Sequence, residues 1–596
     1  AVRYMKEAAQ KTYAKKGEKV VAMNLAAVDA GINSPVKVEV PSSWAQAKDE
    51  RTVDESLPDV VKNIVIPCNR QRGDDLPVSA LAPYQDGTYP MGTSKYDKRG
   101  IAASLPTWDP AKCLQCNQCT FVCPHAAIRA YLVNEEEAKN APAGFTMVDA
   151  KGVAGLKYRL QVSTLDCTGC GSCAESCLAK DKALTMQPVD DTMYDETNWN
   201  YALSLSDKPG VFDRKTLKGS QFAQPLVEFS GACAGCGETP YAKLITQLYG
   251  EKTYWVNGVG CSTAWAGAFP SLAYAKNKEG RGPSYYATLF EDQAENGMGV
   301  VLAVKQRRNY VKLQAKSLLG LTGSEELKAA INAWLESFED LDRNDSDARV
   351  LIAALEKAEL TGEAKIAAEN ILKNKDQLGK KVVWLYGGDG WAYDIGYGGL
   401  DHVMASNEDI NVFVVDTEVY SNTGGQSSKA TPIGASAKFA DGGKKTAKKD
   451  LGRLMMNYPN TYVASVAMGA NPGQLMKALT EAVAHKGPSI IIAYAPCINH
   501  GIKAGMGKAQ AEMKKVVDCG LWPLYRYNPD KKEKPFSLDY KKPSRPVVDF
   551  LDGEVRYAGL KVKFPETAEK LFAEAQVEAD KRYDSYVRLE KSFNEQ

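Results

Sequence analysis

Short apolar runs and longer amphipathic segments alternate along residues 222–518. The runs are rich in β-branched residues and lie at residues 382–386, 412–415, 462–464 and 490–493. Apolar residues recur at helical spacing over residues 325–337, 347–373 and 474–485. Short buried strands that alternate with helices are typical of a parallel sheet covered by helices. We therefore predict an α/β domain with a doubly wound, mostly parallel sheet.

The pattern outside this region predicts shorter and less regular parts. Residues 1–17 predict a lysine-rich helix, followed by strands at residues 19–23 and 35–40. Many Pro and Gly residues and little periodicity in residues 46–107 predict a connector that runs over a surface. The Pro- and Lys-rich tail ends in a predicted helix at residues 567–592, and we expect it to wrap a neighbour rather than form a core. The expected parts are residues 1–45, the connector 46–107, a cysteine-rich domain 108–195, a linker 196–221, the α/β domain 222–518 and the tail 519–596.

Charge and hydropathy exclude several classes of protein. The 74 basic and 73 acidic side chains give a net charge of +1, which argues against a nucleic-acid binder that depends on a basic field. The longest apolar runs are far shorter than the roughly 18 to 20 residues that span a bilayer, so we predict no membrane segment. The lysines near the start are followed by an apolar stretch broken by Asp29, which is not a secretory signal. We therefore expect a cytoplasmic protein.

The 14 cysteines are too sparse for a disulfide scaffold, and most stand in C-x-x-C groups that are typical of metal ligands. Two runs share the spacing x2, x2, x3 of bacterial two-cluster ferredoxins. Three thiolates in one tight loop reach three irons of a cubane, and the fourth thiolate points to the other cluster. The expected ligand sets are Cys113, Cys116, Cys119 and Cys177 for one [4Fe–4S] cluster, and Cys167, Cys170, Cys173 and Cys123 for the other.

Zinc is the alternative for these two runs, because zinc sites also use paired C-x2-C groups. The duplicated spacing, with no His at the spacing of a zinc finger, favours iron–sulfur clusters. The sequence departs from the ferredoxin pattern at Leu178, which replaces the proline after the second run. The long interval between Cys123 and Cys167 predicts an inserted hairpin.

A third set of cysteines is spread along the α/β region. Cys233 and Cys236 stand in a glycine-rich turn, Cys261 follows a second glycine-rich turn, and Cys497 follows the apolar run at 490–493. Their spacing alone leaves a third cluster, a zinc site and a redox dithiol open. Cys68 and Cys519 have no close companions, and we interpret them as ordinary thiols.

A Gly-Asp-Gly sequence, Gly388-Asp389-Gly390, leaves the predicted strand at 382–386 and enters a helix start at Trp391. A phosphate can rest on the exposed amides of such a helix start, with Asp389 as a magnesium ligand. By itself the sequence is equally common in turns. Thiamine-diphosphate enzymes combine it with a downstream Asn after the next strand, and Asn422 stands in that place, so a plain loop is the weaker alternative.

Four segments together resemble the pyruvate:ferredoxin oxidoreductase family: residues 233–238, 289–292, 387–391 and 417–426. The resemblance implies a thiamine-diphosphate-binding fold with an inserted two-cluster ferredoxin-like α+β domain, and it extends over nearly the whole chain. The implied cofactors are thiamine diphosphate, Mg²⁺ and three [4Fe–4S] clusters, the third of them held by Cys233, Cys236, Cys261 and Cys497. The implied magnesium ligands are Asp389, Thr417 and the Val419 carbonyl. The other implied cofactor-binding residues are Gly388, Gly390, Trp391, Glu238, Cys261 and Asn422, with Asn422 catalytic beside the thiazolium.

The resemblance also implies an activity, the oxidative decarboxylation of pyruvate with coenzyme A to acetyl-CoA and CO2. Electrons would pass through the three clusters to ferredoxin or flavodoxin. One alternative is an electron-transfer subunit that serves chemistry located elsewhere. Another is a related enzyme that acts on 2-oxoglutarate, an aromatic oxoacid or oxalate.

Compared with members that form one polypeptide, the sequence looks incomplete. Residues 1–45 resemble only the tail of the domain that precedes the connector. The resemblance implies that the missing half carries the glutamate that activates thiamine, and the arginine and threonine that bind the substrate carboxylate. We therefore expect this chain to be a subunit or a fragment that works with an N-terminal half or partner polypeptide, and the complete enzyme to be a homodimer.

Overall fold

A computed structural model describes residues 1–47, 53–190 and 193–595 and divides the chain into two units, Ala1–Pro58 and Asp59–Gln596. Each unit is described by itself. Residues 48–52 of the expected connector and residues 191–192 of the expected cysteine-rich domain lie outside the described part.

The first unit is helical. Its elements are α1 (Val2–Tyr13), η1 (Ala14–Lys16), α2 (Glu18–Asn33) and η2 (Ser42–Gln46). The helix expected at 1–17 is present in α1, but the strand expected at 19–23 is wrong, because this run continues into an alanine-rich sequence that extends one helix to Asn33. The strand expected at 35–40 is also wrong. The described residues offer it no pairing strand, and Pro35 and Pro41 flank it without backbone N–H donors.

The second unit begins with a turn-rich segment. The short helical turns in it are η3 (Val61–Val65), α3 (Ile66–Asn69), η4 (Gly73–Asp75), η5 (Val78–Tyr84) and η6 (Thr93–Tyr96). Hydrogen bonds help to attach it to the α/β domain: the Thr93 hydroxyl accepts from the Leu272 amide at 2.8 Å, and the Ser94 hydroxyl donates to the Glu228 carbonyl at 2.9 Å.

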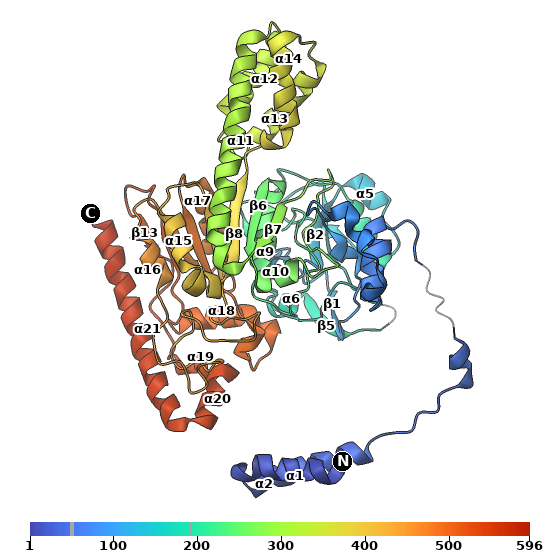
Figure 1. The fold of residues 1–596 in the computed structure, drawn as a ribbon, viewed down its shortest axis with the longest axis vertical. Helices are drawn as coiled ribbons and strands as arrows, with labels where there is room; N and C mark the ends of the chain where they lie inside the picture. The colour runs from blue at the N-terminus through green and yellow to red at the C-terminus, as the bar shows by residue number, and fades with distance from the viewer. Residues whose placement is uncertain (48–52, 191–192, 596) are drawn as a thin grey trace. The chain divides into compact units, whose positions relative to one another are not determined.

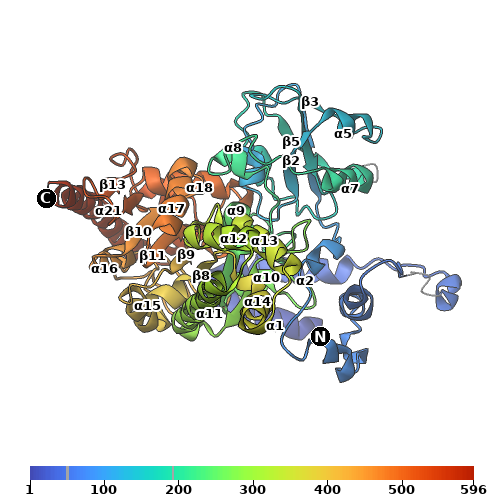
Figure 2. The same ribbon diagram turned by 90° about the horizontal axis from the view of Figure 1, so that it is seen from above.

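The cysteine-rich region is built from two small antiparallel sheets, one with the order β1–β5 and the other β2–β4–β3. The elements are β1 (Ser104–Trp108), α4 (Gln118–Phe121), β2 (Ile128–Val133), α5 (Glu135–Lys139), β3 (Val148–Asp149), β4 (Lys157–Val162), α6 (Ser172–Glu175), β5 (Leu184–Pro188), α7 (Glu196–Ser204) and α8 (Leu217–Ser220). The pairing of β2 with β4 confirms the inserted hairpin expected between Cys123 and Cys167. In Figures 1 and 2 this region lies to one side of the large sheet.

The described residues of the α/β region form an eight-stranded sheet in the order β13-β12-β10-β11-β9-β8-β6-β7. The strands are β6 (Thr253–Gly258), β7 (Ser284–Thr288), β8 (Val382–Gly388), β9 (Asn411–Asp416), β10 (Tyr462–Val466), β11 (Ser489–Tyr494), β12 (Tyr525–Tyr527) and β13 (Phe536–Leu538). The strands from β10 to β7 pair in parallel, and β12 and β13 pair antiparallel at one edge. This confirms the mostly parallel α/β fold.

Central strands are apolar on both faces because helices cover both. Every residue of β9 and of β11 is buried, which explains why these strands are continuous apolar runs rather than alternating ones. Figure 2 shows α11 and α15 on one side of the sheet and α9 and α17 on the other. The helices and turns next to the sheet are α9 (Thr239–Tyr249), η8 (Gly250–Lys252), α10 (Cys261–Ala266), η9 (Phe290–Asp292), η11 (Gly390–Ile395), α15 (Tyr397–Met404), α16 (Leu451–Met455), α17 (Pro472–Ala484), η12 (Ile498–His500), η13 (Met506–Lys508) and α18 (Ala509–Asp518).

A helical insertion extends beyond the sheet between β7 and β8 (Figure 1). It consists of the long α11 (Gln293–Leu321) and of α12 (Glu325–Glu336), α13 (Asn344–Lys357), α14 (Gly362–Lys373) and η10 (Lys375–Gln377). Its far half has its own apolar core, which contains Leu318, Trp334 and Leu351. The helices expected at 325–337 and 347–373 are therefore present, the second one split in two.

The C-terminal tail packs on the chain's own α/β domain. Its helices are α19 (Val548–Leu551), α20 (Val555–Lys563) and α21 (Pro565–Asn594). Ala575, Ala579 and Tyr586 of α21 are buried in the same apolar core as the central strands, although we expected this tail not to form a core. The reason is visible in the sequence, since these residues repeat at the spacing of one helical face.

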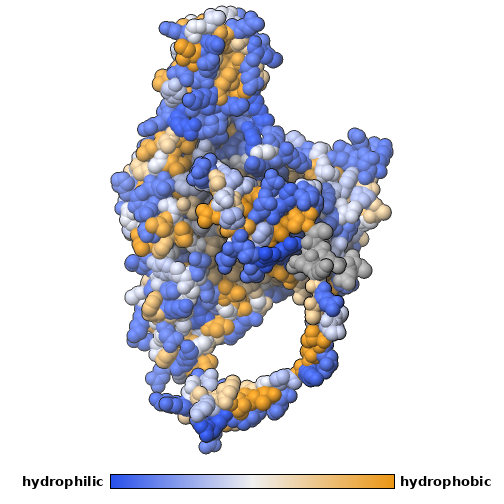
Figure 3. Space-filling model, turned by 45° about the vertical axis from the view of Figure 1, so that its right-hand side comes forward, coloured by the Kyte–Doolittle hydropathy of each residue, from blue (hydrophilic) through white to orange (hydrophobic). Residues whose placement is uncertain are grey.

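On the face shown in Figure 3, hydrophilic side chains predominate and apolar ones form scattered patches. Within the described ranges, no helix has both the length and the apolar character needed to cross a membrane.

Candidate functional site

The first expected ligand set gathers around α4. Cys113 and Cys119 are buried, and the pKa of Cys116 is raised by burial and by the neighbouring thiols of Cys113 and Cys177. The pKa of Cys119 is also raised by burial and by the other three thiols. One of these sulfurs accepts a main-chain hydrogen bond, since Gln115 N–H donates to Cys113 Sγ at 3.4 Å. Cys177 comes from the second run, so the two runs cross as their spacing predicts.

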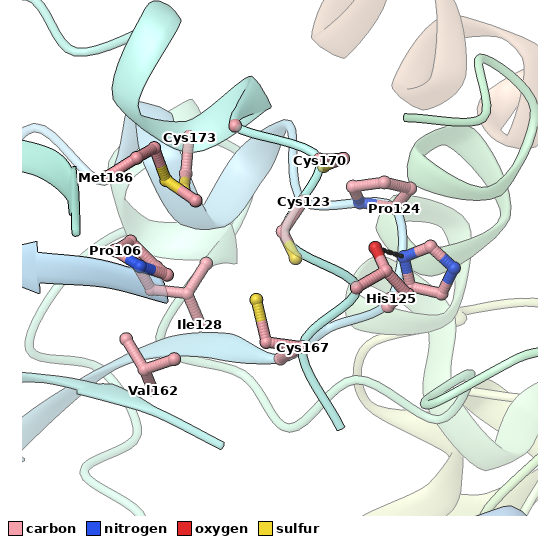
Figure 4. A pocket seen from close by; sticks show the side chains of 13 residues that line it. Pro106, Cys123, Pro124, His125, Ile128, Val162, Cys167, Cys170, Cys173 and Met186 are labelled. Carbon is pink, nitrogen blue, oxygen red and sulfur yellow. Dashed lines mark hydrogen bonds between the residues drawn. The ribbon is translucent and has the colours of Figure 1, made fainter. Parts of the chain in front are cut away.

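The second expected set surrounds a small hollow lined by Cys123, Cys167, Cys170 and Cys173. Figure 4 shows the sulfurs of Cys123 and Cys167 pointing into this hollow from opposite walls. Burial raises the pKa of Cys167 to about 12, and the Cys123 and Cys170 thiols add to the rise. The apolar part of the lining consists mainly of Pro106, Ala127, Ile128, Val162 and Met186.

These surroundings fit anionic iron–sulfur clusters. All the expected ligands are free thiols. Their sulfurs accept amide hydrogen bonds, as in the 3.4 Å contact from Gly169 N–H to Cys167 Sγ and the 3.3 Å contact from Ala183 N–H to Cys177 Sγ. Such bonds, together with soft thiolate ligands in a dry apolar shell, stabilise the charge of a cluster.

The carboxyl ends of four parallel strands carry the remaining site residues to one edge of the sheet. Gly388 of β8 pairs with Val415 of β9, and Asp416 of β9 pairs with Tyr494 of β11. The next residues along these strands include Asp389, Thr417 and Cys497, and Cys261 follows β6. In open α/β sheets this edge is where ligands bind.

The third cysteine set meets at this edge. Burial raises the pKa of Cys261, and the Glu238 carboxylate and the Cys497 and Cys236 thiols add to the rise. Burial also raises the pKa of Cys497 to about 11, with a contribution from Cys233. The four thiols are therefore neighbours, although their sequence positions are far apart.

Glu238 is a buried neighbour of this cysteine set. It is 4% exposed, and burial raises its pKa to about 7. Its Oε2 accepts from Trp265 Nε1 at 3.0 Å, and its amide donates to Cys236 Sγ at 3.4 Å. Glu238 is therefore a buried carboxyl group that can hold a proton near neutral pH.

The expected magnesium ligands lie within contact distance of one another. Thr417 Oγ1 donates to Asp389 Oδ1 at 3.0 Å and lies 3.0 Å from the Val419 carbonyl oxygen. Ser428 Oγ donates to Asp389 Oδ2 at 2.7 Å. Burial and the Asp416 carboxylate both raise the pKa of Asp389, so this oxygen cluster favours a bound cation. Carboxylate, hydroxyl and carbonyl oxygens are the donors that Mg²⁺ prefers.

The two glycines that flank Asp389 differ in the space beside their backbone. A Cβ on Gly388 would meet no atom within 4 Å, whereas a Cβ on Gly390 would lie 2.5 Å from the Tyr420 ring. A π-helical turn, η11, starts at Gly390 and buries Trp391. Asn422 is exposed, and within the described residues its amide has no hydrogen-bond partner. These residues fit a diphosphate on the main chain of Gly388, with Asn422 free to meet a ligand.

Buried charges beside the Thr417–Val419 loop were not predicted from the sequence. Lys448 Nζ lies 2.7 Å from Asp416 and 3.2 Å from Glu418, and Arg556 lies 2.8 Å from Glu418 and 2.6 Å from Glu554. Glu418 has a φ of 61°, in the left-handed region. We infer that the ion pairs keep Glu418 in this conformation, which turns both Thr417 Oγ1 and the Val419 carbonyl toward Asp389. These pairs could not be predicted from a local sequence pattern, because Arg556 is far from Glu418 in the sequence.

His125 was also missed, although it follows Cys123 by two residues. Its Nε2 lies 3.0 Å from the Ala232 carbonyl, and Thr168 Oγ1 lies 3.3 Å from its Nδ1. Ala232 precedes Cys233 and Thr168 follows Cys167, so one buried ring connects the second and third cysteine sets. Figure 4 shows this ring beside the hollow of the second set.

The comparisons with protein families match three parts of the chain. Residues 46–102 match a domain of unknown function called EKR, residues 105–128 match a 4Fe-4S binding domain, and residues 364–493 match the C-terminal TPP binding domain of thiamine pyrophosphate enzymes. The last two matches support iron–sulfur clusters and thiamine diphosphate as cofactors.

Curated relatives match nearly the whole chain. Pyruvate:ferredoxin oxidoreductase of Moorella thermoacetica is 52% identical over 99% of this chain and 51% of its own length. Pyruvate-flavodoxin oxidoreductase of Enterobacter agglomerans is 48% identical over 99% of this chain and 51% of its own length. The mitochondrial pyruvate dehydrogenase [NADP(+)] of Euglena gracilis is 43% identical over 99% of this chain and 33% of its own length. The chain thus spans about half the length of the first two relatives and about a third of the length of the last.

Proposed function

Because the chain belongs to the pyruvate:ferredoxin oxidoreductase family, we propose that it forms the thiamine- and cluster-binding part of an enzyme that oxidises pyruvate. The reaction would convert pyruvate and coenzyme A into acetyl-CoA and CO2, with the electrons delivered to ferredoxin or flavodoxin. Thiamine diphosphate supplies the stabilisation of the carbanion that decarboxylation requires. The half of the relatives that this chain does not represent would supply the groups that activate thiamine and bind the substrate carboxylate.

One contact carries this proposal. Cys261 Sγ of the third cysteine set lies 3.2 Å from Ser421 Oγ, in the loop that also holds Thr417, Val419 and Asn422. A cluster at this set would therefore stand beside the diphosphate site, where electrons leave the substrate. An electron-transfer subunit with chemistry located elsewhere would not need the oxygen ligands of Asp389 and Thr417 at that place.

The residues divide the work between binding and electron transfer. Asp389, Thr417 and the Val419 carbonyl would hold Mg²⁺ and through it the diphosphate, with the main chain from Gly388 to Trp391 along the phosphates. Asn422 would donate a hydrogen bond to the substrate oxygen that gains charge. Glu238 and Cys261 would close the cofactor site on the cluster side. The third, second and first cysteine sets would then carry single electrons outward.

The test is oxoacid-dependent turnover of the complete enzyme, assembled from this chain and the missing half. We expect coenzyme-A-dependent reduction of ferredoxin or flavodoxin with pyruvate, and much slower reduction with 2-oxoglutarate, phenylpyruvate or oxalate. Faster turnover of any of these three would overturn the substrate assignment. Light scattering of the same assembly tests the expected homodimer.

Since the cysteines of this chain work as reduced ligands, we propose a cytoplasmic location.

A further inference from the structure

A buried lysine connects the α/β domain to the ferredoxin-like region. Lys243 lies on α9, seven residues after Cys236, and is 2% exposed. Its Nζ donates to the Phe121 carbonyl at 3.1 Å and also to the Thr120 carbonyl. Both carbonyls stand at the end of α4, between Cys119 of the first ligand set and Cys123 of the second.

Lys243 has no acidic partner within the described part of the chain. The titratable groups that act on it are the thiols of Cys123 and Cys119 and the guanidinium of Arg129. The Glu228 carboxylate is paired with Arg129 and is therefore not a partner of Lys243. Burial lowers the pKa of Lys243 to about 8. Because this value is still above neutral pH, most of the amine stays protonated.

A buried cation without a carboxylate is unfavourable unless another anion stands nearby. Cubane clusters with four thiolate ligands are anionic, and reduction adds one more negative charge. The potential of such clusters depends on net charge, hydrogen bonds and burial. In a dry interior the attraction between a cluster and a fixed cation is poorly screened.

We propose that Lys243 is the countercharge of the two ferredoxin-like clusters and raises the reduction potential of both. The proposal rests on the cluster ligands of the proposed function and adds to it a residue from the thiamine-binding domain. Lys243 touches no ligand sulfur. It acts through the carbonyls between Cys119 and Cys123 and is therefore a positioning residue, which makes these clusters better acceptors for electrons that arrive from the third cysteine set.

The test is an EPR-monitored redox titration of the full chain after anaerobic reconstitution. In Lys243→Met we expect the midpoint potentials of the two ferredoxin-like clusters to shift to more negative values, with a smaller shift for the third cluster. Lys151→Met is the matched control. Lys151 Nζ donates to the Cys113 carbonyl at 2.7 Å, but this lysine is exposed, so water screens its charge and its loss should shift the potentials less.

Unshifted potentials in Lys243→Met with full iron content would overturn the proposal. If Lys243→Met loses its clusters, Lys243→Arg decides the outcome. Clusters with wild-type potentials in that variant support the charge role, whereas failure of both variants indicates a packing role and contradicts it. Absence of the two ferredoxin-like EPR signals from the wild-type chain would instead contradict the proposed function, so the two failures are distinguishable.

Discussion

Asp389 is placed where a carboxylate is costly unless a cation joins it. It is 1% exposed, and the buried Asp416 acts on it from the neighbouring strand. The hydroxyls of Thr417 and Ser428 satisfy its two oxygens with hydrogen bonds but do not neutralise its charge. A divalent ion that bridges Asp389 and a diphosphate would do so, and we therefore expect this one acidic residue to decide cofactor binding.

The first prediction therefore concerns Asp389→Asn. The variant keeps the size of the side chain but loses the charge that holds Mg²⁺. We expect the affinity for thiamine diphosphate in the presence of Mg²⁺ to fall by about a hundredfold or more, equivalent to about 3 kcal/mol, with iron content unchanged. Calorimetric titration of the complete enzyme measures the affinity. In the control Asp394→Asn, which removes a carboxylate paired with Lys429 outside the oxygen cluster, the affinity should change little. Equal affinities in both variants would contradict the magnesium assignment.

We expect Asn422 to lie on the reacting side of the site, because its exposed amide is available to a ligand. For Asn422→Ala we expect kcat to fall by about tenfold to a hundredfold, because a donor to developing charge is lost. The affinity for thiamine diphosphate should stay within a few-fold of the wild type. Steady-state kinetics and cofactor titration together separate the two effects. A parallel loss of kcat and affinity would instead indicate a purely structural turn residue.

Site residues could be predicted from the sequence where they stand close together at a spacing typical of their chemistry. The two cysteine runs and the Gly-Asp-Gly sequence specify their candidate residues before any fold is known. Lys243 and Arg556 could not be found in this way, because their partners lie far away in sequence and a single Lys or Arg carries no pattern. Ser428 was missed for the same reason, since only the folded loop brings it to Asp389.

At the scale of elements, long apolar runs predicted the central strands well because β8, β9 and β11 are buried on both faces. The run at 19–23 looked the same over five residues, yet it belongs to α2, because the alanines that follow continue the helix. A short apolar run therefore needs its flanking sequence to distinguish a strand from a helix. The antiparallel edge strands β12 and β13 were not predicted, since each has only three residues.

The C-terminal segment contacts the Thr417–Val419 loop through Arg556, the second residue of α20, which lies between Glu418 and Glu554. For Arg556→Met we expect the free energy of unfolding to fall by about 3 to 5 kcal/mol, because the buried Glu554 loses its guanidinium partner and the buried Glu418 keeps only Lys448. Denaturant titration of the chain measures it. The matched control is Arg545→Met, which breaks an exposed pair with Asp549 and should cost less than about 1 kcal/mol. Similar losses in both variants would contradict the role of the buried pairs.

At the scale of the whole molecule, contacts link the three cysteine sets to one another and to the edge of the sheet that carries Asp389. Ser421 joins the diphosphate loop to the third set, and His125 joins the third set to the second. Cys123 and Cys177 then cross between the two ferredoxin-like sets. We expect electrons to travel along this series, while the substrate-binding groups come from the half of the relatives that this chain does not match.

This division predicts that the chain alone binds clusters but does not oxidise pyruvate. Thiamine diphosphate should bind weakly to it, because we expect this chain to supply only the magnesium side of the cofactor site. Addition of the missing half should restore ferredoxin reduction. Pyruvate-dependent reduction of ferredoxin by the purified chain, with no other polypeptide present, would refute the expected division of labour.

The most direct test of the central claim, a thiamine site with three clusters in one chain, is metal analysis of the chain purified without oxygen. Four irons in each cubane give about twelve irons and about twelve sulfides per chain, and we expect these values with no zinc. A value near eight irons with one zinc would place zinc at Cys233, Cys236, Cys261 and Cys497 and would contradict an electron path that starts beside the diphosphate.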